Sequence, residues 1–119
     1  MPEFCKSRAW IELDREALRH NVSFLRSRLP GGCELMPAVK ANAYGHGAAL
    51  IARECERMGI SAFCVATAQE GAELRRAGIG GELLVLGYTH PKEFPLLFRY
   101  DLTQTVLDLP YAETLNSWG

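Results

Sequence analysis

The residues best suited to chemistry lie in one short segment, where a lysine ends an apolar stretch and is followed by a tyrosine and two glycines. The segment reads Pro37-Ala38-Val39-Lys40-Ala41-Asn42-Ala43-Tyr44-Gly45-His46-Gly47. A lysine amine can form an imine with a carbonyl cofactor, a tyrosine hydroxyl can reach an anion, and glycines let the backbone turn tightly. These residue types indicate a covalent cofactor site at Lys40, although many lysines at strand ends are only solvated charges.

The elements that must position this lysine alternate between apolar strands and amphipathic helices. Such alternation is typical of parallel βαβ units. The pattern alone does not separate half of a barrel from an open, doubly wound sheet. Pro37 is unusual inside a strand, because proline has no N–H to donate. We predict strands over residues 8–13, 34–40, 62–66, 82–86 and 102–107, and helices over about 15–28, 48–58, 67–77, 91–100 and 110–116.

In parallel α/β folds, ligands bind at the carboxyl ends of the strands. Lys40 lies at one such end, and so do Thr67, Gly87-Tyr88 and Leu107-Asp108. We therefore expect these positions to line one mouth of the fold. We further expect Asp14 to cap the first helix, whose arginines would form a solvated face.

The composition is that of an ordinary globular α/β segment. Hydrophobic residues make up 48% of the 119 residues and charged residues 23%, and the net charge of −1 gives no electrostatic case for nucleic acid or an anionic membrane. The first residues lack the apolar core of a secretory signal, and no apolar run has a membrane-spanning length. We expect a cytoplasmic protein. Four cysteines, Cys5, Cys33, Cys55 and Cys64, have no metal-ligand spacing and are expected to be mostly buried thiols, so no metal site is predicted.

Residues 40–47 closely resemble the pyridoxal-phosphate (PLP) signature of the alanine racemase family. Weaker segments resemble the same family in the expected order, at residues 10–14, 17–21, 66–71, 76–79 and 84–87. The resemblance spans about residues 8 to 110. It implies a (β/α)8 TIM-type barrel, which typically needs about 250 residues.

Residues 1–119 therefore resemble the N-terminal part of such a racemase, about the first half of its PLP-binding barrel. The second half of the barrel and the family's C-terminal β domain would be absent, so we interpret the chain as a fragment. An isolated half-barrel would expose apolar faces and strand edges near Glu34 and Leu102. It is expected to self-associate, to be partly disordered, or to need the missing half.

The resemblance also implies roles for individual residues. Lys40 would hold PLP as an aldimine and, once freed by the substrate, would abstract the Cα proton of the D-isomer. Tyr44 would hydrogen-bond the cofactor phosphate. Leu86 matches an apolar residue that packs near the cofactor. A leucine that only packs in the barrel interior would explain this position equally well. Asn42 and His46 are expected to shape the turn through hydrogen bonds to the backbone.

The family's second catalytic base is a tyrosine from the partner subunit of a homodimer, and no tyrosine of this chain matches it. The family's arginine facing the pyridine nitrogen is absent as well. The resemblance thus implies a small amino-acid substrate, alanine or serine, and a chain that is inactive alone. Three alternatives remain open at this stage: a noncatalytic PLP-carrying barrel protein, a PLP-dependent decarboxylase of the same barrel class, and a structural or regulatory fragment that pairs with a complementary chain.

Overall fold

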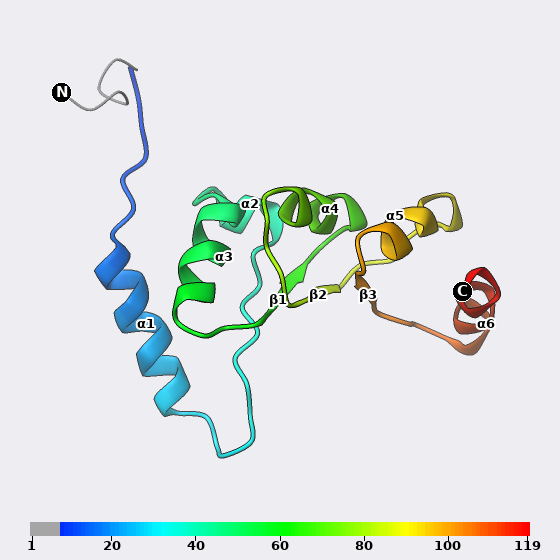
Figure 1. Cartoon of the computed structure of the whole chain (residues 1–119), viewed down its shortest axis with the longest axis horizontal. Helices are drawn as coiled ribbons and strands as arrows, with labels where there is room; N and C mark the ends of the chain where they lie inside the picture. Colours follow the sequence, from blue (N-terminus) through cyan, green and yellow to red (C-terminus); the bar gives the residue numbers. More distant parts are fainter. Residues whose placement is uncertain (1–7) are drawn as a thin grey trace.

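The computed structural model describes residues 8–119, in which short parallel strands alternate with helices (Figure 1). A 3-10 turn, η2, precedes α5. In chain order the elements are α1 (Arg15–Ser27), α2 (Lys40–Tyr44), α3 (Ala48–Arg57), β1 (Ala62–Val65), α4 (Ala68–Arg76), β2 (Glu82–Val85), η2 (Pro91–Glu93), α5 (Phe94–Arg99), β3 (Thr103–Gln104) and α6 (Leu109–Trp118).

The three strands form one parallel sheet in the order β1-β2-β3. Ala62 pairs with Glu82 at the start of β1, and Leu84 pairs with Thr103 across β2 and β3. Each strand thus lies beside the next one in sequence, and a helix connects them. This arrangement confirms the predicted parallel α/β units. All four residues of β1 are buried, which accounts for the continuous apolar stretch that predicted this strand.

The predicted strand over residues 34–40 is wrong in extent. Ala38 alone forms a bridge, to Cys64 of β1. The Val39 N–H donates to the Cys64 carbonyl, and the Cys64 N–H donates to the Pro37 carbonyl, both at 2.9 Å. Pro37 has no N–H with which to make the next rung toward the N-terminus, and the chain enters α2 at Lys40. The strand is therefore limited to one bridge.

Two other predicted strands also differ from the structure. Residues 8–13 form no strand, and Ile11 and Leu13 are exposed, because β-propensity produces a strand only where packing and a neighbouring strand support it. The last strand is two residues long instead of the predicted six, since its pairing with β2 ends at Gln104. Val106 beyond it is exposed.

The helices begin close to where the sequence places them. The Asp14 carboxylate accepts from the Ala17 N–H at the start of α1, and the Thr67 hydroxyl oxygen accepts from the Glu70 N–H at the start of α4. The predicted helix over residues 91–100 is divided into η2 and the short α5, because Pro95 has no N–H to donate to the carbonyl of residue 91 as one continuous helix would require.

Helices α3, α4 and α5 follow one another along the sheet, and α6 lies at the far end of the chain (Figure 1). The main core contains side chains of β1, β2 and these helices, including Phe63, Leu83 and Phe94, which are fully buried. The radius of gyration is 16.5 Å, whereas a compact domain of this length has about 13.5 Å. Large apolar side chains remain exposed at several places, among them Phe24, Leu50, Phe98, Leu107 and Trp118.

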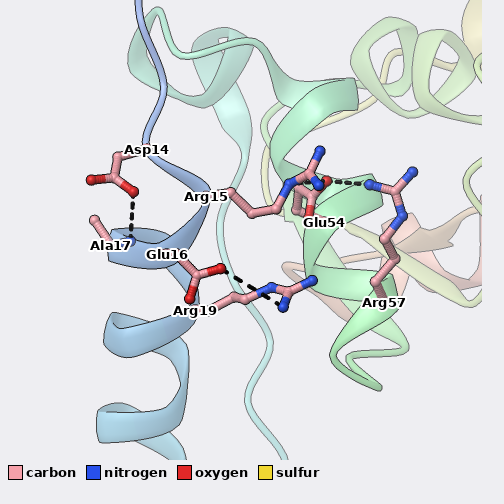
Figure 2. A network of polar contacts seen from close by, with 7 residues as sticks. All are labelled: Asp14, Arg15, Glu16, Ala17, Arg19, Glu54 and Arg57. Atoms are coloured by element: carbon pink, nitrogen blue, oxygen red, sulfur yellow. Dashed lines mark hydrogen bonds and ion pairs between the residues drawn. The ribbon is translucent and has the colours of Figure 1, made fainter.

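Helix α1 is attached to α3 by apolar and polar contacts, and Leu18 packs against the core. Val22 is the buried residue of α1. Arg15 Nε lies 3.1 Å from Glu54 Oε1, and Arg57 pairs with the same oxygen (Figure 2). Arg26 donates to the Met58 carbonyl oxygen at the end of α3. The arginines of α1 are exposed, as predicted, but Arg15 and Arg26 also connect the helix to its neighbour.

Candidate functional site: a lysine on a left-handed turn

The predicted mouth corresponds to one edge of the sheet, which we call the carboxyl edge. Lys40 follows the bridge at Ala38, Thr67 follows β1, Gly87 follows β2 and Leu107 follows β3. Because the strands are parallel and adjacent, their carboxyl ends share this edge. Lys40, Thr67 and Gly87 thus follow strand ends on this edge, whereas Leu107 lies three residues beyond the end of β3 and is exposed.

Lys40 is partly buried and lies next to Val39, which is 2% exposed. The buried neighbour fixes the backbone at Lys40. Within residues 8–119 the Lys40 ammonium forms neither an ion pair nor a hydrogen bond with another side chain or carbonyl. Its amine is therefore available to a ligand.

The backbone after Lys40 has an unusual conformation. Ala41, Asn42, Ala43 and Tyr44 have φ angles of 51°, 55°, 54° and 54°, so four successive non-glycine residues form a left-handed turn, residues 41–44. Such a conformation costs an L-residue about 1–2 kcal/mol, so it persists only where the surroundings determine it. The sequence predicted a tight turn at the glycines and did not reveal a left-handed turn ahead of them.

Hydrogen bonds within the segment hold the far end of the left-handed turn. Asn42 Oδ1 accepts from the Ala48 N–H at 2.8 Å, and His46 Nδ1 lies 2.8 Å from the Ala43 carbonyl oxygen. The Gly47 N–H also donates to the Asn42 carbonyl at 2.9 Å. The predicted role of Asn42 and His46 in shaping this segment is confirmed. Asn42 is also one of the residue types that tolerate left-handed backbone best.

The near end of the left-handed turn is held by a residue from another helix. Glu70, in the first turn of α4, accepts from the Ala41 N–H at 2.9 Å through Oε2 and from the Ala66 N–H at 2.6 Å through Oε1. One carboxylate thus connects the backbone after Lys40 to the backbone after β1. Sequence reasoning recognised Glu70 only as part of a family-like segment, since its partner Ala41 lies 29 positions earlier.

The other two predicted site residues lie on the same edge but in different surroundings. Tyr44 ends the left-handed turn, is 67% exposed, and lines a cavity between this turn and α1 together with Leu18 and Pro37. Leu86 is the first residue after β2 and is 41% exposed. Its N–H donates to the Val65 carbonyl at 2.8 Å, which fixes its backbone beside β1.

A polar cluster that the sequence did not reveal holds the loop after β2. Thr89, which is buried, donates through its hydroxyl to Gln104 Oε1 at 2.5 Å, and the Gln104 amide donates to the Gly87 carbonyl at 2.8 Å. The Tyr111 hydroxyl donates to the Thr89 carbonyl at 2.8 Å. Burial raises the pKa of Tyr111. Tyr111 therefore stabilises the carboxyl edge as a hydrogen-bond donor.

The thiols and acidic groups form no further site in the part of the chain that the structure describes. Residues 8–119 contain no group of three or more histidine, cysteine, aspartate or glutamate side chains arranged to hold a metal ion. Cys55 and Cys64 are buried, as expected for most of the cysteines, and this burial raises the pKa of both thiols, whereas Cys33 is exposed. Cys5 lies outside the described residues. No helix within residues 8–119 combines the length and apolar character needed to cross a membrane.

The described fold is the start of a known barrel domain. The crystal structure of alanine racemase from E. faecalis superposes with a TM-score of 0.83 and 39% identity, covering 89% of this chain and 29% of that one. An alanine racemase from Bacillus anthracis with bound L-Ala-P gives a TM-score of 0.81 at 33% identity, over 87% of this chain and 27% of that one. The described residues thus match the start of a TIM-barrel domain, which confirms the predicted α/β fold class.

Sequence comparison identifies the family. A family model for the N-terminal domain of alanine racemase matches residues 13–119. An amino-acid racemase of Enterococcus faecalis is 41% identical over 109 residues, covering 92% of this chain and 16% of the relative. An alanine racemase of Geobacter sp. (strain M21) is 41% identical over 106 residues, covering 89% and 28%. The chain belongs to the alanine racemase family, and it spans less than a third of the length of these relatives.

Proposed function

We propose that this chain supplies the lysine-bearing part of an amino-acid racemase site, in which the Lys40 amine holds pyridoxal phosphate. The observation that carries the proposal is the place of Lys40 at the carboxyl edge, with no ion-pair partner among residues 8–119 and directly before a left-handed turn held from both ends. Strain that the surroundings determine so fully is typical of functional sites. Membership in the alanine racemase family supports the same reading.

The residues present fit a covalently held carbonyl cofactor. An amine attacks an aldehyde in its unprotonated form, which an ion pair with a carboxylate would disfavour, and Lys40 forms no ion pair within residues 8–119. Tyr44 is exposed on the same turn, where its hydroxyl can donate to a phosphate oxygen. Leu86 offers an exposed apolar side chain beyond β2. We assign these three residues to the cofactor: Lys40 by covalent attachment, Tyr44 by hydrogen bonding and Leu86 by packing.

When bound, pyridoxal phosphate supplies an electron sink that makes the Cα–H of an attached amino acid acidic. The part played by this chain is to move that proton. The Lys40 amine, released when a substrate amine takes its place, accepts the Cα proton from one face of a small amino acid such as alanine or serine. Inversion needs a second acid on the opposite face, and we assign that role to a tyrosine outside residues 1–119, contributed by a second subunit of a homodimer.

Catalysis by residues 1–119 alone is therefore not expected. Two alternatives predict different binding behaviour. A noncatalytic PLP-carrying barrel protein would bind the cofactor and never racemise an amino acid, even with the missing half supplied. A structural fragment would bind the cofactor only together with its complement. A cytoplasmic location remains a prediction from the sequence.

The test compares residues 1–119 alone with a joined protein, in which residues 1–119 are fused to the remainder of the E. faecalis alanine racemase. Each is incubated with pyridoxal phosphate, reduced with borohydride and digested, and the modified peptide is identified by mass spectrometry. We expect the label on Lys40, loss of label and visible absorbance in Lys40→Met, and retention of both in Lys92→Met. Lys92 is the matched control because it is exposed on η2, away from the left-handed turn.

The joined protein is then assayed for D-alanine formation from L-alanine. Racemisation that depends on Lys40 supports the proposal. Labelling of Lys92 in preference to Lys40, or turnover that survives Lys40→Met, would contradict it. Labelling of Lys40 without any turnover in the joined protein would favour the noncatalytic carrier.

A further inference from the structure

We propose that Glu70 is a positioning residue for Lys40, which sets the orientation of the Lys40–Ala41 peptide group and through it the direction of the lysine amine. The proposal rests on the assignment of Lys40 as the cofactor lysine. It concerns a residue that reaches Lys40 only through the backbone.

The geometry of the carboxylate supports this role. The Ala41 N–H belongs to the peptide group that follows Lys40, and it donates to Glu70 Oε2 at 2.9 Å. The Ala66 N–H belongs to the peptide group that follows β1, and it donates to Oε1 at 2.6 Å. Both oxygens of one side chain are used, and each fixes a strand end at the carboxyl edge. Glu70 thereby sets the position of Lys40 relative to β1.

A simple helix-capping role does not explain these contacts. In a capping box the glutamate at the third helical position accepts from the N–H of the capping residue itself. Here the Thr67 oxygen accepts from the Glu70 N–H at 3.1 Å, as such a box requires. The Glu70 carboxylate, however, accepts from Ala66 and Ala41. Its oxygens are therefore directed to the two strand ends.

The left-handed turn gives this bond its importance. Residues 41–44 have a backbone conformation that L-residues rarely adopt, so the turn depends on contacts at its two ends. Asn42 and His46 hold the far end, next to α3. Glu70 is the side chain that holds the near end, adjacent to Lys40, within residues 8–119. Loss of this contact frees the peptide group that carries the lysine.

Replacing one carboxylate oxygen of Glu70 by an NH2 group tests the positioning role with little change in side-chain volume. In Glu70→Gln, a single acceptor oxygen remains for two N–H donors, and the new NH2 group faces one of those donors. Glu73→Gln is the matched control, because Glu73 lies in the same helix and is exposed. Both variants remove one negative charge from α4.

The first readout is hydrogen exchange of the Ala41 amide in the joined protein, measured by NMR. We expect exchange about tenfold faster in Glu70→Gln, as for loss of one hydrogen bond, and unchanged exchange in Glu73→Gln. The second readout is the rate at which Lys40 captures pyridoxal phosphate, trapped with borohydride, and it should fall in Glu70→Gln alone. In turnover, kcat should fall more than KM changes. The misdirected Lys40 amine would slow proton transfer, whereas substrate binding would be little affected.

The outcomes separate this inference from the proposed function. Unchanged Ala41 exchange and unchanged cofactor capture in Glu70→Gln would overturn the positioning role. A drop in unfolding midpoint with no change at Ala41 would also overturn it, because Glu70 would then act only on α4. If the wild-type joined protein fails to capture the cofactor at Lys40, the proposed function fails. The Ala41 exchange still decides whether Glu70 fixes the backbone after Lys40.

Discussion

Replacing Ala41 with glycine should stabilise this protein, although the same change in an ordinary helix destabilises. Ala41 is exposed and has a φ angle of 51°, so its methyl group contributes little burial and strains the backbone. Ala17 in α1 is the control, because it is an exposed alanine in a regular right-handed helix. The two substitutions remove the same methyl group from backbones of opposite hand.

The magnitude follows from two opposing contributions. Relief of the left-handed strain at Ala41 is worth about 1–2 kcal/mol. The greater freedom of glycine in the unfolded chain lowers stability by about 0.5–1 kcal/mol at either site. Ala41→Gly should therefore raise the free energy of unfolding by about 0.5–1 kcal/mol, and Ala17→Gly should lower it by a similar amount. The two variants should differ by about 1–2 kcal/mol, a separation that denaturant titration resolves.

Urea unfolding followed by circular dichroism at a fixed protein concentration provides the measurement, together with native-state hydrogen exchange at residues 41–44. Equal destabilisation by Ala41→Gly and Ala17→Gly would refute the reasoning, because the left-handed backbone would then carry no strain in solution. A second glycine variant, Ala43→Gly, should gain less than Ala41→Gly, since Ala43 is buried and its methyl group contributes packing.

Three further predictions concern the fold and its titration. Gly81→Ala should lower the unfolding free energy by more than about 3 kcal/mol, because its Cβ would lie 2.2 Å from the Ser61 carbonyl oxygen at a φ of +71°. Gly78→Ala, with a φ of +91° and open space around it, should lose only about 1–2 kcal/mol in the same titration. The free energy of unfolding should decrease as the pH rises above about 8.5, the ordinary thiol pKa. Burial raises the pKa of Cys55 and Cys64 in the folded chain. The folded chain therefore retains protons that the unfolded chain releases in this pH range. A constant free energy from pH 8 to pH 10 would contradict this sign. Finally, the chain alone should self-associate through its exposed apolar side chains, and light scattering that shows a monodisperse monomer would contradict that expectation.

Local signals in the sequence predicted the helices well. Asp14 and Thr67 cap the helices where short polar residues precede an apolar pattern, and the buried strand at 62–66 is recognisable from its continuous apolar residues. Each of these features depends on residues within a few positions of one another. The parallel sheet could therefore be predicted from the alternation of such segments.

The features that sequence reasoning missed depend on distant partners. Residues 8–13 have the composition of a strand and form none, because strand pairing is decided by neighbours elsewhere in the chain. The left-handed turn has a recognisable signal only at Asn42, and the contact that fixes its near end comes from Glu70. The proposed cofactor lysine could thus be selected from its local segment, whereas the Glu70 contact with the backbone after it could not.

The order in which the strands pair has a consequence for synthesis of the protein. Each strand lies beside the next one in sequence, and the carboxylate that holds the backbone after Lys40 comes from residue 70. Every contact identified around Lys40 is therefore available once β1 and the first turn of α4 have left the ribosome. The nascent chain can fix the backbone around Lys40 before the later strands emerge from the ribosome, so assembly of the proposed cofactor site can begin co-translationally.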